Sequence, residues 1–282
     1  MQTRADCHIH MVLDGFWWRD AIARHSQGPE DGFIRKALAQ YQAQGYGYLR
    51  DGGDRWGVGK RARDLAPEYG IEYCTPLSPL CKAGHYGAFI GEKYESFKEF
   101  SALVGNQRRN GADFIKIMIS GLMDFDRFGV LTEEGLPAWE IRELIHIAHE
   151  EGFSVMAHAN GARTVEAAAM AGVDSVEHGA YLDGDALKAM EENGTIWVPT
   201  LSTVGNLQGK GRFDEVAVRK ILDSALENLE KFQGIVAPGS DAGAWAVAHG
   251  CDSEEAWMLQ VCSQDRLQQG IDRLQAKFFR KK

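Results

Sequence analysis

The sequence lacks several features, and each absence argues against a class of protein. No apolar run approaches the ~20 residues that cross a membrane, and the N-terminus shows no apolar signal-peptide core. No basic block occurs and the formal charge is −9, which argues against nucleic acid or anionic membranes as partners. The five cysteines are scattered without a Cys-x-x-Cys pair, which argues against disulfides or a thiolate zinc site. We expect a cytoplasmic protein with free thiols that acts on a small molecule.

Strand-like and helix-like segments alternate along the chain, the pattern of a parallel sheet with helical crossovers. The strand-like segments are 5–11, 46–50, 71–76, 113–119, 153–158, 173–178, 195–200 and 235–238. The helix-like segments are 30–44, 60–69, 94–110, 137–151, 162–171, 183–193 and 214–232, with a helical, solvated tail over about 252–282. Eight such units in one domain, 1–282, predict an α/β fold, a (β/α)8 TIM barrel of the usual ~250 residues. An open doubly wound sheet is disfavoured, since no Gly-rich phosphate turn follows the first strand.

Two histidines lie one residue apart on the first predicted strand. Side chains alternate along a strand, so His8 and His10 project from one face and can bind one metal ion. Such a pair also arises by chance on a solvated strand. The other candidate ligands are more informative than this pair alone. They come at or near the ends of later predicted strands, where a barrel gathers its functional groups. These candidates are Lys116, His158, His178 and Asp241.

Four histidines and two oxygen ligands suffice for two divalent ions. One ion would be held by His8, His10 and Asp241. The other would be held by His158 and His178.

Lys116 needs separate treatment, because an ammonium has no lone pair and remains charged at a pKa near ~10.4. It could bridge two metal ions only if its amine were carboxylated. Otherwise it would pair with Asp241 or contact the substrate.

Five short motifs, in this order along the chain, resemble the amidohydrolase superfamily. They are DCHIH at 6–10, FIKIM at 114–118, AHANG at 157–161, EHG at 177–179 and GSDAG at 239–243. RDGG at 50–53 and GHYG at 84–87 resemble its branch of prolidase-like Xaa-Pro dipeptidases and imidazolonepropionase relatives. The superfamily usually adds a small β-sandwich, of which this chain has little or none. It would then be a minimal variant or a piece of a longer protein.

The resemblance implies a metal-dependent hydrolase with two divalent ions, taken as zinc. Its ligands would be His8, His10, His158, His178 and Asp241, with Lys116 as a carboxylated bridge. A metal-bound hydroxide would attack an amide-type C–N bond of a dipeptide, N-acyl amino acid or cyclic amide. Asp241 would take the proton of the water and deliver it to the leaving amine.

Three alternatives remain beside this function. A lactone or ester could be hydrolysed by the same groups. A mononuclear deaminase of the superfamily usually carries a glutamate three residues after the histidine of the fifth strand, where this chain has Gly161 after His158. A non-catalytic scaffold would typically have lost ligands, and none of the set is missing. Homo-oligomerisation is implied only by family habit.

Four further residues are candidates for contact with the substrate. His85, in a glycine-rich loop, could hydrogen-bond a carbonyl oxygen in the transition state, a catalytic role. Arg50 could clamp a carboxylate or serve as loop scaffolding with a neighbouring aspartate. Asn160 and Tyr181 could contact substrate or support ligands.

Aromatic residues concentrate in the predicted loops that follow strands. They could line a pocket, plug the top of the barrel or form a subunit contact. They are Phe16, Trp17, Trp18, Trp56 and Trp245.

Overall fold

The computed structural model describes residues 4–278 and has an α/β fold with parallel sheets, as predicted. A three-stranded sheet has the order β1 (Arg4–Ile9), β2 (Tyr46–Asp51), β3 (Glu72–Cys74). A six-stranded sheet has the order β5, β4, β6, β7, β8, β9. Its strands are β4 (Leu80–Lys82), β5 (Glu92–Tyr94), β6 (Ile115–Met118), β7 (Val155–Ala159), β8 (Ser175–His178) and β9 (Ile196–Val198).

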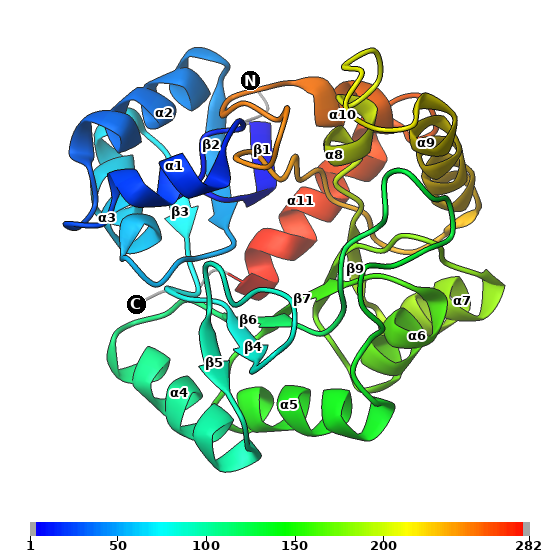
Figure 1. The fold of residues 1–282 in the computed structure, drawn as a ribbon, viewed down its shortest axis with the longest axis horizontal. Helices are drawn as coiled ribbons and strands as arrows, with labels where there is room; N and C mark the ends of the chain where they lie inside the picture. Colours follow the sequence, from blue (N-terminus) through cyan, green and yellow to red (C-terminus); the bar gives the residue numbers. More distant parts are fainter. Residues whose placement is uncertain (1–3, 279–282) are drawn as a thin grey trace.

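Helices surround the strands on the outside (Figure 1). The long outer helices are α2 (Asp31–Ala43), α3 (Val58–Leu65), α4 (Phe97–Arg109), α5 (Ala138–Glu150), α6 (Ala162–Met170), α7 (Gly184–Asn193) and α9 (Glu215–Lys231). Shorter or terminal helices are α1 (Trp18–Arg24), η1 (Ala66–Tyr69), α8 (Ser202–Gly205), α10 (Ser253–Met258) and α11 (Gln264–Phe278). Each outer helix buries an apolar stripe; in α5 this is Ile141, Leu144, Ile145 and Ala148, at helical spacing.

Backbone hydrogen bonds also join segments beyond the named strands. The Asp113 N–H donates to the Thr75 carbonyl at 3.0 Å, between the end of β3 and the start of β6. On the other side, Trp197 of β9 exchanges two bonds with residues 235–237, and the Cys7 N–H of β1 donates to the Pro238 carbonyl at 2.8 Å. Residues 235–238 therefore lie between β9 and β1 and connect the two sheets.

Residues 235–238 were predicted as the eighth strand, and here the structure differs. This segment forms an isolated parallel bridge between Val236 and Trp197 rather than a regular strand. Pro238 has no N–H to continue a ladder. The chain then turns at Asp241, whose φ is +58°. The pairing is therefore too short to count as a strand.

The glycine-rich loop that holds His85 contains a strand that the sequence did not reveal. β4 lies within it and pairs in parallel with both β5 and β6. Three-residue strands are too short to show the alternation of apolar and polar residues by which strands are identified.

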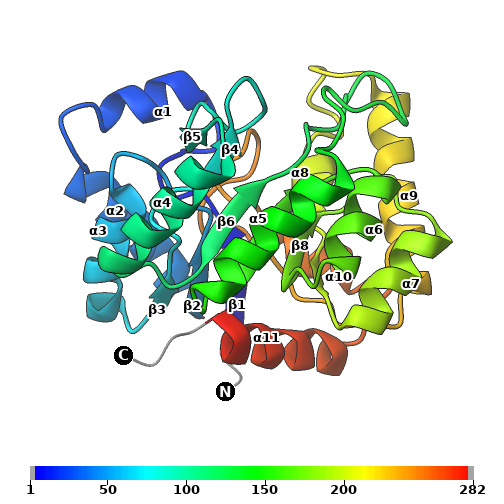
Figure 2. The same cartoon turned by 90° about the horizontal axis from the view of Figure 1, so that it is seen from below.

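The tail was predicted to be solvated, and this prediction is wrong for its inner face. Leu267, Ile271, Leu274 and Phe278 of α11 are buried. The last three belong to an apolar cluster with strand residues such as Cys7 and Val198, and with Phe114 just before β6. Figure 2 shows α11 across the end of the strands opposite to α1. The helix therefore covers the base of the strand assembly.

Within residues 4–278, no helix is both long enough and apolar enough to span a membrane. The predicted lack of a signal peptide rests partly on residues 1–3, and the basic end of the tail on 279–282. Both segments lie outside the described residues.

Candidate metal centre

Three predicted ligands converge at the end of β1. The Nε2 atoms of His8 and His10 are 3.4 Å apart. The Asp241 Oδ1 atom lies 3.6 Å from Nε2 of His8 and 3.4 Å from Nε2 of His10. All three residues are buried, and they form a group able to hold a metal ion.

The spacing of these atoms suits a metal ion. Ligand atoms about 2.0–2.2 Å from a tetrahedral zinc lie about 3.3–3.6 Å from one another. Burial lowers the pKa of His10 to about 3, and lowers the pKa of His8 well below its usual value. Both imidazoles are therefore neutral at pH 7, with lone pairs available to a cation.

Three of the four site histidines, His8, His158 and His178, have one ring nitrogen held by a neighbouring oxygen atom. His8 donates from Nδ1 to the Glu177 carboxylate at 2.7 Å, which leaves Nε2 as its free acceptor. His158 donates from Nε2 to the Gly121 carbonyl at 3.1 Å, which leaves Nδ1 free. Nδ1 of His178 lies 2.7 Å from Oγ1 of Thr200.

His158 and His178 form the second predicted pair. Their ring centroids are 4.5 Å apart, and the His178 ring lies 5.2 Å from that of His8. His178 has a φ of +70°, an uncommon conformation for a residue other than glycine. The structure thus brings both predicted pairs into one site.

Lys116 lies fully buried in the same site, and its Nζ has no hydrogen-bond partner among the described residues. Burial lowers its pKa to about 8, opposed by the attraction of Glu177. Burial also raises the pKa of Asp241 to about 8, opposed by Lys116. Nδ1 of His10 and Oδ1 of Asp241 are likewise unpartnered within residues 4–278. Buried polar atoms are rarely left in this state, so the cluster fits a site completed by bound ions.

Glu177, which the sequence analysis did not identify, lies directly behind the ligands. Its carboxylate accepts hydrogen bonds from His8, from Ser175 Oγ at 2.5 Å, and from Arg50 at 2.8 and 2.9 Å. Its position beside His178 in the sequence was the available signal, because a ligating histidine commonly has a carboxylate behind it.

Arg50, predicted to contact substrate or an aspartate of its own loop, pairs with Glu177 in the structure. Its side chain is fully buried and also donates to the Cys7 carbonyl and to Ser175. The guanidinium lies 4.5 Å from the ring centroid of Phe278 in α11. It therefore belongs to the interior beneath the ligands.

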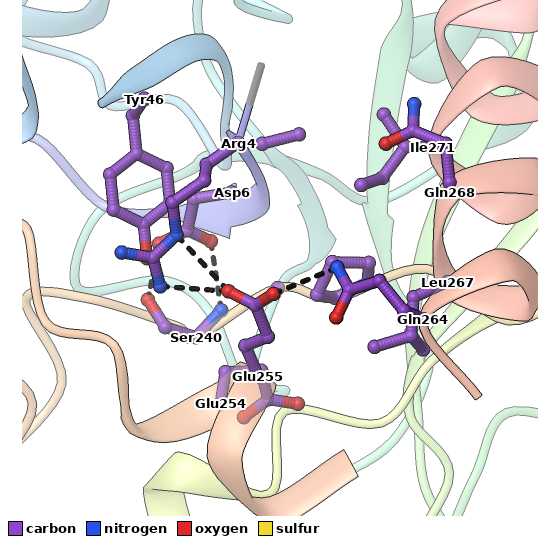
Figure 3. A pocket seen from close by; sticks show the side chains of 13 residues that line it. Arg4, Asp6, Tyr46, Ser240, Glu254, Glu255, Gln264, Leu267, Gln268 and Ile271 are labelled. Carbon is purple, nitrogen blue, oxygen red and sulfur yellow. Dashed lines mark hydrogen bonds and ion pairs between the residues drawn. The ribbon is translucent and has the colours of Figure 1, made fainter. Parts of the chain in front are cut away.

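Asp6 holds the turn that carries Asp241. Its carboxylate accepts from the Ser240 N–H at 2.8 Å and from the Ser240 hydroxyl at 2.5 Å. The Ser240 oxygen in turn accepts from the Ala242 N–H at 3.1 Å. Figure 3 shows this pair beside a small pocket of about 40 Å³ that Glu254 also lines. The pocket faces the support of the turn rather than the ligands.

The other predicted contact residues are mostly occupied elsewhere. His85 is paired with the Glu133 carboxylate, and its neighbour Tyr86 stacks at 4.7 Å over the His158 ring. Asn160 is buried and donates to the Gly121 carbonyl, the same atom that orients His158. Tyr181 packs edge-on against Phe128.

A cavity of about 640 Å³ opens above the ligands. His10, Lys116, His158, His178 and Asp241 form its floor. Of the five aromatic residues that were predicted as candidates for a pocket, four line it, namely Phe16, Trp17, Trp18 and Trp245, whereas Trp56 does not. Tyr86 also lines it, whereas His85, Asn160, Tyr181 and Arg50 do not.

Similarity to known proteins agrees with this arrangement. No family model matches the sequence. Ochratoxinase of Aspergillus niger is 25% identical over 272 residues, covering 83% of this chain and 55% of that protein. An uncharacterized protein of Mycobacterium tuberculosis is 28% identical over 194 residues, covering 64% of this chain and 50% of that protein. The chain thus spans about half the length of the curated relatives it matches.

Solved structures decide the fold. A Xaa-Pro dipeptidase with bound methionine in the active site has a TM-score of 0.79 at 20% identity, covering 98% of this chain and 76% of that one. A second structure, described as an amidohydrolase, has a TM-score of 0.74 at 22% identity, covering 93% and 70%. This chain has the amidohydrolase fold. The resemblance of its motifs to the amidohydrolase superfamily agrees with this fold, and the candidate ligands lie on its strands, directly after β1 or in the segment that follows residues 235–238.

Proposed function

We propose that this amidohydrolase-fold chain is a metal-dependent hydrolase that cleaves an amide-type C–N bond of a small substrate. The observation that supports it best is the convergence of His8, His10 and Asp241 at 3.4–3.6 Å, beside a cavity of about 640 Å³ that His10 and Asp241 line. Buried ligand atoms without a hydrogen-bond partner lower the stability of the fold unless a cation binds to them.

We propose that the parallel strands complete a (β/α)8 barrel. We also propose that this barrel has two sites for divalent ions. His8, His10 and Asp241 would hold one ion, and His158 and His178 the other. A bound zinc ion lowers the pKa of water and polarises a carbonyl group. Lys116 would bridge as a carboxylated amine, supported by its lowered pKa, because carboxylation requires the neutral amine.

Asp241 is the proposed general acid and base. A carboxylate at this position can accept a proton from water and return it to the departing nitrogen. The acyl carbon gains the hydroxyl group as the C–N bond breaks, and the amine nitrogen gains the hydrogen.

Elemental analysis of protein purified without added metal tests the proposal. We expect about two ions per chain, and in intact mass the increment of one carboxyl group on Lys116. His178→Ala should lose metal, whereas the matched control His146→Ala, on the exposed face of α5, should retain it. No bound metal after reconstitution, with an intact fold, would contradict the proposal.

A further inference from the structure

The walls of the cavity are far more aromatic than its floor. Phe16 and Trp17, which lie before α1, are 68% and 62% exposed. Aromatic residues from four other loops face the same cavity, namely Phe89, Phe125, Phe213 and Trp245. Apolar side chains left exposed around a concave site are typical of a surface that binds a ligand.

An arginine lies within this aromatic wall. The Arg212 guanidinium is 4.4 Å from the ring centroid of Trp245, 5.2 Å from Phe213 and 5.5 Å from Trp17. Arg19 lies similarly over Trp18 at 4.3 Å. Stacking fixes the plane of a guanidinium while its N–H groups remain free to donate.

Neither arginine forms an ion pair with a carboxylate of residues 4–278. Around the mouth of the cavity, the charged side chains are these two arginines and Asp20. The mouth therefore carries a net positive charge on a protein whose total formal charge is −9. A cleft of this sign favours an anionic ligand.

We propose that the substrate is an amide that carries an aromatic ring and, on the far side of that ring, a carboxylate bound by Arg212. The amide would lie on the cavity floor, the ring against the tryptophan walls, and the carboxylate at the mouth. A planar guanidinium held by three rings matches a carboxylate through two parallel hydrogen bonds. Arg212 is then a residue that determines specificity.

This inference rests on the proposed hydrolase function for the position of the amide, but binding tests it independently of turnover. The probes are 4-acetamidobenzoate and acetanilide, which differ only by the carboxylate, measured by calorimetry. We expect the wild-type protein to bind the carboxylate at least about tenfold tighter. Arg212→Met should remove the preference, and Arg212→Lys should keep part of it.

The matched control is Arg219→Met on the outer face of α9, which should keep the full preference. Equal affinity of the wild-type protein for the two probes, or no binding of either, would overturn the inference. So would an unchanged preference in Arg212→Met.

Release of 4-aminobenzoate by the metal-loaded protein separates the two proposals. A raised KM with little change in kcat in Arg212→Met supports both. Preferential binding that depends on Arg212 but never leads to hydrolysis supports the binding inference and counts against the hydrolase. Equal hydrolysis of both probes by both proteins supports the hydrolase and overturns the inference.

Discussion

Two clusters of buried polar groups lie one above the other, and they differ in how their atoms are paired. In the lower one, which we call the Arg50 network (Arg50, Ser175 and Glu177), the guanidinium and the carboxylate are matched by short hydrogen bonds. In the upper one, the ligand cluster formed by the six proposed metal ligands, atoms of Lys116, His10 and Asp241 have no partner among the described residues. The two meet where Glu177 accepts from His8.

The difference separates stability from function. A buried charge whose partners are all present contributes to one defined native state, and removing a partner is costly. A buried group without partners lowers stability and persists where a ligand completes it. The Arg50 network therefore supports the ligand cluster rather than taking part in its chemistry.

The largest expected effect is on catalysis in the ligand cluster. Asp241→Asn should lower kcat by about 10²–10⁴-fold, the usual contribution of a general acid or base, since an amide cannot accept the proton. Kinetics on a confirmed substrate, with metal content measured in parallel, provide the test. Asp223→Asn on the exposed face of α9 is the control. A near-normal kcat in Asp241→Asn would eliminate the assigned role.

The Arg50 network should show the largest effect on stability. Glu177→Gln leaves the Arg50 charge buried without its counter-ion, which should cost about 3–5 kcal/mol of unfolding free energy. Urea unfolding of the metal-free protein measures this cost. The double variant Arg50→Met, Glu177→Leu should recover much of it, because no isolated charge remains. A loss below about 1 kcal/mol in the single variant would place the pair among weak surface-like ion pairs.

Lys116→Met should change the free energy of unfolding in the opposite direction to Glu177→Gln. Removing an unpartnered buried amine should stabilise the metal-free protein by about 1–3 kcal/mol, while metal content falls. The same urea unfolding applies, with Lys220→Met on the exposed face of α9 as the control. If Lys116→Met were destabilising, the contrast between the two clusters would be broken.

The smallest effect is expected at the cavity rim. His85→Ala should lower kcat less than about tenfold, below about 1.4 kcal/mol, because His85 pairs with Glu133 and does not line the cavity. Tyr86→Leu should cost more, since this ring stacks on His158. A larger kinetic defect in His85→Ala than in Tyr86→Leu would return His85 to a direct role.

The sequence predicted the features that repeat along the chain. It missed the contacts between residues that lie far apart in the sequence. Alternating segments and the histidines at their ends were sufficient for the parallel α/β arrangement and for the six candidate ligands. Arg50 shows the limit, because its partner Glu177 lies 127 residues away and no local pattern links them. α11 shows it again, since a solvated and a buried amphipathic helix have the same periodicity.

The sequence alone therefore determined the alternation of strands and helices, apart from β4, β5 and residues 235–238, and which side chains can bind a metal ion, because side-chain chemistry and hydrophobic period are local properties. The tertiary structure decided which of those side chains are desolvated, which are already paired and which face the cavity. His85 and Tyr86 are neighbours in the chain, yet only Tyr86 lines the cavity. Burial and pairing result from the packing of the whole fold, so no single segment contains them.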